Sequence, residues 1–184
     1  MNILFFLKKS CNINDDTTKI MEPGQIRKKA ALTFPFCVCH FFMGEDVYMD
    51  EIYMKEAIVE AQKAFNNGDV PVGSIIVRND QIIARSYNCK ESTKNPLDHA
   101  ELIAIKQASN YIGDWRLNDC TMYVTLKPCM MCLGAILESR IKKIVYGTTV
   151  IKEQDTSKLI IEGNVMEVEC KDILQEFFKK RRNS

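Results

Sequence analysis

A histidine and a glutamate two positions apart, followed by two cysteines three positions apart, constrain this chain more than any other feature. The two halves are His99-Ala100-Glu101 and Pro128-Cys129-Met130-Met131-Cys132. One imidazole and two thiolates are ligands that zinc prefers, and three protein ligands leave the fourth tetrahedral position to water, whose pKa then falls toward neutrality. The pattern therefore predicts one zinc ion per subunit, bound by His99, Cys129 and Cys132, with Glu101 beside it as a carboxylate that is not a ligand.

A Cys-x-x-Cys pair alone is not specific to such a site, because it is also typical of thioredoxin-like dithiols and of half of a structural zinc site. The chain has only two histidines, His40 and His99, and no second Cys-x-x-Cys pair, so a closed four-cysteine site would need scattered single cysteines. The His-x-Glu half and the proline before Cys129 instead match the signature of nucleobase deaminases. In that chemistry Glu101 is the expected catalytic residue, which moves a proton from water to a ring nitrogen and the leaving amine.

Length and composition predict one globular domain preceded by an unusual leader. The chain has 184 residues, and its 25 basic and 24 acidic residues give a net charge of +1, which by itself does not indicate nucleic-acid binding. Its 8 cysteines are scattered, and a chain of this length needs no disulfides, so we expect a reducing, cytoplasmic setting. The run Cys37-Val38-Cys39-His40 is more easily ascribed to chance than to a second metal site.

The apolar runs within residues 1–49 are too short, or wrongly flanked, for an export signal or a membrane span. We therefore expect no membrane role. Residues 1–49 are expected to be an atypical leader, disordered or not translated, and residues 50–184 to be the zinc-dependent deaminase domain.

Hydrophobic periodicity predicts helices and strands that alternate after residue 50. We expect strands over 72–78, 81–87, 120–126 and 141–146, helices over 50–67, 99–110, 129–138 and 169–180, and a loop over 86–96. Asn79-Asp80 predicts a two-residue hairpin turn. The alternation predicts an α/β sandwich. Both ligand motifs fall at helix starts, where free N–H groups and the helix dipole favour thiolates.

Several further motifs resemble the bacterial tRNA-specific adenosine deaminases. They are Val70-Pro71-Val72-Gly73, Asn88, Trp115-Arg116-Leu117, Tyr123-Val124-Thr125-Leu126, Ser139-Arg140-Ile141 and Val145-Tyr146-Gly147, together with the two ligand motifs. The resemblance runs from about Met54 to Arg182. It implies a cytidine-deaminase-like three-layer α/β/α sandwich with a mixed sheet of about five strands, and a homodimer with one zinc per subunit. It also implies the reaction, in which the wobble adenosine of a tRNA anticodon is hydrolysed to inosine and ammonia.

The resemblance also implies substrate-binding residues. Asn88 has the position of the family's base-contacting asparagine, although an asparagine there is also a common turn residue. Val72 and Ala100 are the other substrate-binding candidates. The partner is then a tRNA anticodon stem-loop, and phosphate contacts are expected from the basic tail, which is also consistent with a solvated terminus: Lys179, Lys180, Arg181 and Arg182.

Three departures from the family pattern leave the substrate open. Lys127 replaces the usual glutamate before Pro128, and Asp98 precedes His99, where we expect it to cap the following helix. The segment between Gly147 and the apolar stretch at Val165, the expected fifth strand, is short, although it is long enough for a parallel crossover. Two alternatives therefore remain: a deaminase of a free base or nucleoside (guanine, cytosine or adenosine), and an inactive zinc-binding partner subunit. The intact Glu101 argues against the second.

Overall fold

The computed structural model describes residues 38–150 and 159–183, with side chains from residue 48 onward. Contacts divide the chain into two units, Met1–Gly44 and Glu45–Ser184, and every side chain discussed below lies in the second. The side chains of the Cys37–His40 run and most of the predicted leader lie outside the described residues. Of the helices described, none is both long and apolar enough to cross a membrane.

Five strands form one mixed sheet in the order β2-β1-β3-β4-β5. Their bounds are β1 Gly73–Arg78, β2 Gln81–Tyr87, β3 Cys120–Leu126, β4 Lys143–Thr148 and β5 Ile160–Glu162. β1 pairs antiparallel with both β2 and β3, whereas β3 with β4 and β4 with β5 are parallel pairs. Asn79 and Asp80, which join β1 to β2, both have positive φ values (51° and 61°), as a tight hairpin turn requires. The predicted hairpin is therefore confirmed.

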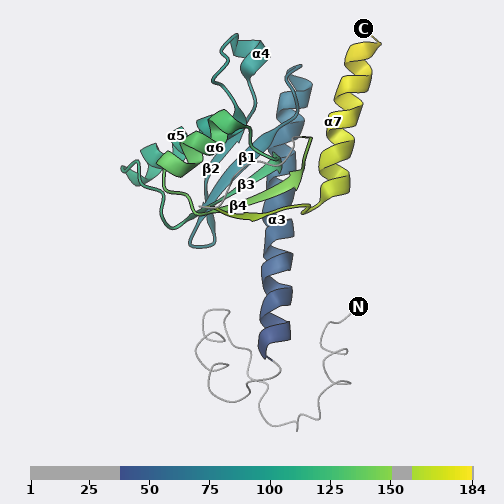
Figure 1. The fold of residues 1–184 in the computed structure, drawn as a ribbon. Coiled ribbons are helices and arrows are strands. Elements are labelled where there is room, and N and C mark those ends of the chain that lie inside the picture. Colours follow the sequence, from purple (N-terminus) through teal and green to yellow (C-terminus); the bar gives the residue numbers. More distant parts are fainter. Residues whose placement is uncertain (1–37, 151–158, 184) are drawn as a thin grey trace, which may run out of the picture. The chain divides into compact units, whose positions relative to one another are not determined.

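Helices cover both faces of this sheet (Figure 1). Helices α5 (Ala100–Ile112) and α6 (Met130–Glu138) pack on one face, in a core that includes Ile76, Ile136 and Ile144. Helices α3 (Val38–Asn66) and α7 (Glu167–Arg182) contribute to a second core on the other face, which includes Met54 and Cys170. The molecule is thus the three-layer α/β/α sandwich that the sequence predicts.

Three elements differ from the sequence prediction. α3 begins at Val38, not at residue 50, because no proline interrupts residues 38–66 and the helix continues through them. A short helix, α4 (Lys90–Thr93), lies inside the predicted loop. The fifth strand is Ile160–Glu162 and precedes Val165, whose N–H instead donates to the Tyr146 carbonyl beyond a turn at Asn164 (φ 65°).

Gly73 opens β1 in direct contact with α3. A Cβ atom built at this position would overlap the Ala57 carbonyl oxygen and the Ala61 amide nitrogen, and would lie 2.9 Å from the Glu60 Cβ. The first two of these atoms belong to the helix backbone and cannot rotate away. The absence of a side chain at Gly73 therefore sets how closely α3 approaches the sheet, immediately after Val72.

Candidate metal centre and substrate pocket

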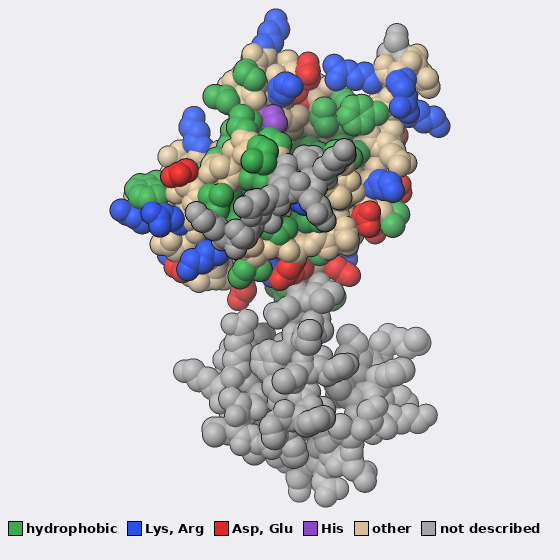
Figure 2. Space-filling view, in the orientation of Figure 1, with side chains coloured by type: hydrophobic (Ala, Val, Ile, Leu, Met, Phe, Trp, Pro, Cys, Tyr) green, Lys and Arg blue, Asp and Glu red, His purple; other side chains and the backbone are tan. Residues whose placement is uncertain are grey.

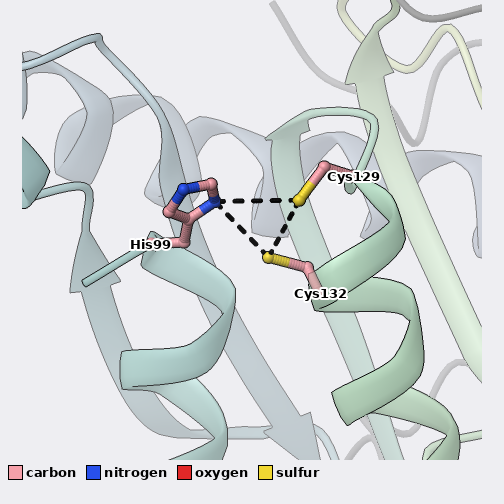
Figure 3. A group of neighbouring side chains, drawn as sticks. All are labelled: His99, Cys129 and Cys132. Carbon is pink, nitrogen blue, oxygen red and sulfur yellow. Dashed lines mark hydrogen bonds between the residues drawn. The ribbon is translucent and has the colours of Figure 1, made fainter. Parts of the chain in front are cut away.

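The first residues of α5 and α6 bring the three predicted ligands together. His99 and Cys129 are the N-cap residues of these helices, neither makes a side-chain cap, and Cys132 lies in the first turn of α6. The Nδ1 atom of His99 lies 3.9 Å from the Cys129 Sγ and 3.6 Å from the Cys132 Sγ, and the two sulfur atoms are 3.7 Å apart (Figure 3).

This triangle has the dimensions of a zinc site. Zinc–sulfur bonds of about 2.3 Å and a zinc–nitrogen bond of about 2.1 Å at tetrahedral angles place two sulfur atoms about 3.8 Å apart and sulfur about 3.6 Å from nitrogen. The observed separations agree, so the donor set fits a tetrahedral metal with one position free. Within residues 48–150 and 159–183 it is the only group of three such side chains close enough to share an ion.

Glu101 lies in the first turn of α5, 4% exposed, and lines the same pocket as His99 and Cys129. Burial raises the pKa of its carboxyl, while its own backbone N–H and the Cys132 thiol act in the opposite direction. A carboxyl group with a raised pKa takes up and releases a proton closer to neutral pH, as a general acid and base must.

The Cys132 thiol is fully buried, and burial followed by the charge of Glu101 raises its pKa. At this residue burial thus outweighs the expected contribution of the helix start. A metal ion that binds this sulfur would have to displace the thiol proton.

A pocket of about 180 Å³ opens beside the ligands, lined by Val70, Val72, Asn88, Lys90, His99, Glu101, Leu126, Lys127 and Cys129. Two of the three predicted substrate contacts, Val72 and Asn88, are on its wall. Ala100 is not among the lining residues; its side chain is buried in the core and its carbonyl accepts a 2.6 Å hydrogen bond from the Ser86 hydroxyl.

Sequence reasoning did not assign three of the lining residues to the site: Val70, Lys90 and Leu126. Each had a signal, because Val70 and Leu126 lie within motifs that resemble the family and Lys90 lies two positions after Asn88. Lys127 was noticed only as a departure from the family pattern; the structure places it on the pocket wall, half-buried, with its Nζ 5.6 Å from the centre of the Tyr146 ring.

Asn88 is fixed at two points. Its backbone N–H donates to the Val72 carbonyl at 2.9 Å, and its side-chain nitrogen donates to the Val70 carbonyl at 3.2 Å.

The expectation that Asp98 caps α5 is wrong. Its carboxylate accepts a 2.8 Å hydrogen bond from the Asn95 amide instead, which turns it away from the helix start and braces the loop.

The structure divides the basic tail into two pairs. Lys179 and Arg182 line a groove of about 610 Å³ beside α7, whereas Lys180 pairs with Glu176 (3.0 Å) and Arg181 with Glu91 (3.9 Å). The groove and the pocket share two lining residues, Val70 and Leu126. In Figure 2 hydrophobic side chains extend from the histidine, in purple, toward the Lys and Arg side chains at the end of α7.

Comparisons with known proteins agree with this architecture. The model of the MafB19-like deaminase family matches residues 48–182. A tRNA-specific adenosine deaminase of Bacillus subtilis (strain 168) is 40% identical over 146 residues, which cover 72% of this chain and 91% of that protein. This chain belongs to the tRNA-specific adenosine deaminase family. The resemblance predicted from the motifs is therefore confirmed.

Two solved structures of other deaminases have a fold similar to that of this chain. A structure from studies of A-to-I editing by tRNA:A34 deaminases at the wobble position has a TM-score of 0.62 and 31% identity, covering 66% of this chain and 97% of that one. A guanine deaminase from Bacillus subtilis has a TM-score of 0.51 and 37% identity, covering 54% and 64%. The deaminase fold is thus shared by proteins with different named substrates.

Proposed function

We propose that this deaminase hydrolyses the wobble adenosine of tRNA anticodons to inosine and releases ammonia. The single observation that carries the chemistry is the triangle of His99, Cys129 and Cys132 beside the buried carboxyl of Glu101 in one pocket. The substrate is supported by the 40% identity to a tRNA-specific adenosine deaminase over 91% of that protein's length.

His99, Cys129 and Cys132 would hold one zinc ion per subunit. Such an ion supplies a Lewis acid that makes water nucleophilic near neutral pH. Glu101 is left free to move protons. It takes one proton from the attacking water as the new carbon–oxygen bond forms, and passes it to the ring nitrogen next to the reacting carbon. It then takes the second proton of the same water from the hydroxyl on that carbon and delivers it to the departing amine. One water is consumed, and the carbon–nitrogen bond of the amine is the bond that breaks.

The pocket wall then binds the base, and the groove binds the strand. Asn88 offers a polar contact that is held rigid by Val70 and Val72. Lys179 and Arg182 in the adjoining groove supply positive charge for phosphates, and Phe178, 45% exposed in the same groove, offers a face for stacking a base. Of the four predicted RNA contacts we retain these two and assign Lys180 and Arg181 a smaller role, because both already pair with carboxylates.

The proposal includes a homodimer in the cytoplasm. Large apolar side chains are exposed along α5, α6 and the loops next to them: Leu97, Tyr111, Trp115, Met130, Met131 and Leu137. Several exposed apolar side chains on neighbouring elements are typical of a protein interface. The five cysteines whose side chains the structure describes are all free, which suits a reducing compartment. We also propose that residues 50–184 are the catalytic unit and that residues 1–49 are dispensable for it.

A free nucleobase such as guanine is the second candidate substrate. The guanine deaminase of Bacillus subtilis is 37% identical to this chain in the part where the two align, and a free base needs no groove beyond the pocket. An inactive partner subunit is disfavoured, because Glu101 is present and buried beside the ligand triangle.

The test is a comparison of substrates. Purified zinc-loaded enzyme is incubated with an anticodon stem-loop carrying adenosine at the wobble position, with the same stem-loop carrying guanosine there, and with free adenosine and free guanine. We expect inosine and ammonia from the first RNA alone. Glu101→Gln is the control, since it should retain zinc and lose turnover by about a hundredfold or more. Rapid ammonia release from free guanine, with the RNA left unchanged, would select the second candidate.

A further inference from the structure

Asp69 is a buried carboxylate that the proposed chemistry does not use. It follows Gly68 at the end of α3, and its side chain is fully buried. Its Oδ1 atom accepts a 2.6 Å hydrogen bond from the backbone N–H of Glu91 and a longer one, 3.4 Å, from that of Ser92. Both donors belong to the first turn of α4, so one carboxylate from another element holds the start of that helix.

α4 has no cap of its own. Its N-cap residue, Cys89, makes no side-chain hydrogen bond to the helix, and the first N–H groups of any helix lack partners inside it. A carboxylate is among the best acceptors for those groups and also suits the positive end of the helix. Asp69 therefore caps α4 from a distance, by accepting the hydrogen bonds that the side chain of an N-cap residue usually accepts.

The residues around the start of α4 form one side of the pocket. Asn88 and Lys90 flank Cys89, and both line the pocket. The Cys89 N–H donates at 3.0 Å to the Asp98 carbonyl, next to the metal ligand His99. The backbone around Cys89 thus connects the start of α4 to two residues that line the pocket.

We propose that Asp69 is a positioning residue, which fixes Asn88 and Lys90 on the pocket wall by capping α4. The identity of the bound substrate rests on the proposed function, but the positioning does not. Without the cap the wall is less ordered before substrate arrives, so binding is weakened more than the chemical step. Asp69 touches neither the ligands nor the reacting atoms.

The test compares three variants. Asp69→Ala removes the acceptor, and Asp69→Asn keeps an oxygen of the same size in the same place. Asp50→Ala is the matched control, because it removes another buried carboxylate, one that accepts a hydrogen bond from Tyr123 and does not line the pocket. For each variant we measure KM, kcat, bound zinc, thermal unfolding and the hydrogen exchange of the amides in residues 88–92.

For Asp69→Ala we expect KM to rise on the order of tenfold, with a smaller change in kcat, full zinc content and faster exchange of the Glu91 and Ser92 amides. Asp69→Asn should restore most of the KM. Asp50→Ala should lower the unfolding temperature and leave KM unchanged. A normal KM and slow exchange in Asp69→Ala, or an equal rise of KM in Asp50→Ala, would overturn the proposal. If Asp69→Ala does not fold, Asp69→Ser, with a shorter acceptor, takes its place in the same comparison.

Failure of the proposed function gives a different result. In that case the wild-type enzyme itself leaves the stem-loop unchanged. The kinetic comparison is then made with the free base or nucleoside that the wild type does deaminate. The exchange of the Glu91 and Ser92 amides still decides whether Asp69 holds α4.

Discussion

The Tyr123 hydroxyl donates a 2.6 Å hydrogen bond to the Asp50 carboxylate, joining the central strand β3 to α3. Lys143 lies 3.5 Å from the other oxygen of Asp50 and 2.9 Å from Glu162 of β5. Burial raises the pKa of Asp50, although the Tyr123 hydroxyl and the charge of Lys143 act in the opposite direction. The sheet and α3 are thus connected through an acid that burial makes harder to ionise.

Replacement of Asp50 by Asn should change how stability depends on pH. Because the folded-state pKa of Asp50 lies above its ordinary value of 3.8, the folded protein holds this proton at pH values where the unfolded chain has lost it. This contribution to stability is complete below the ordinary value and is lost as pH rises through the folded-state pKa. The asparagine can still accept the Tyr123 hydrogen bond.

The free energy of unfolding of Asp50→Asn, relative to that of wild type, should therefore increase between about pH 4 and about pH 7. Urea titrations of both proteins at the two pH values measure the difference. A difference that stays constant, or that moves in favour of the wild type, would contradict the raised pKa.

Cys129→Ser should lose the metal and destabilise the domain. The serine hydroxyl is a poor zinc ligand, and the free energy of metal binding at such a site also contributes to folding. We expect the zinc content to fall well below one per subunit and the unfolding temperature to drop. Elemental analysis after dialysis and thermal unfolding measure the two effects. Cys89→Ser, a cysteine outside the ligand triangle, is the matched control and should retain zinc.

Two double variants, each of which removes two positive charges, test the two pairs of basic residues at the end of α7 separately. Lys179→Ala with Arg182→Ala removes two of the three cations that line the groove and leaves Lys171 in place. Lys180→Ala with Arg181→Ala removes the cations that pair with Glu176 and Glu91. Only the first should weaken stem-loop binding strongly and flatten its dependence on salt, by a slope of about 2 for two lost phosphate contacts. Fluorescence anisotropy over a range of salt concentrations measures both. Equal losses would mean that net charge alone attracts the RNA.

Removal of residues 1–49 should leave deamination intact, because all the lining residues of the pocket and the groove lie at or after Val70. This deletion cuts α3, which begins at Val38, so a second deletion that keeps the whole helix, lacking residues 1–37, is the control. We expect the same kcat/KM for both. An active shorter deletion and a folded but inactive longer one would assign the first turns of α3 to the enzyme.

Local patterns were enough to predict that His99, Cys129 and Cys132 lie close together. The ligands occupy fixed positions at the starts of two helices, so spacing along the chain carries the information, and strands such as Cys120–Leu126 are evident from short apolar runs. The hairpin at Asn79 and Asp80 is equally local, since the turn requires residues that tolerate positive φ.

Features that depend on distant partners were not predictable. α4 forms where its cap comes from Asp69, more than twenty positions earlier, and nothing in residues 86–96 signals it. Arg181 is drawn away from the groove by Glu91, a contact between the last helix and α4. The pairing of Lys180 with Glu176, by contrast, follows the ordinary spacing of ion pairs on a helix and was open to prediction.

The close approach of α3 to Gly73 has a consequence for the evolution of this enzyme. Since even a methyl group at residue 73 would overlap the helix backbone, a library randomised at this codon and selected for activity should return glycine alone. Val72 next to it lines the pocket and also packs in the core, so we expect it to accept only side chains of similar size. We therefore expect selection for altered specificity to act on residue 72 while residue 73 stays glycine, so that the pocket is reshaped with the distance between α3 and the sheet unchanged.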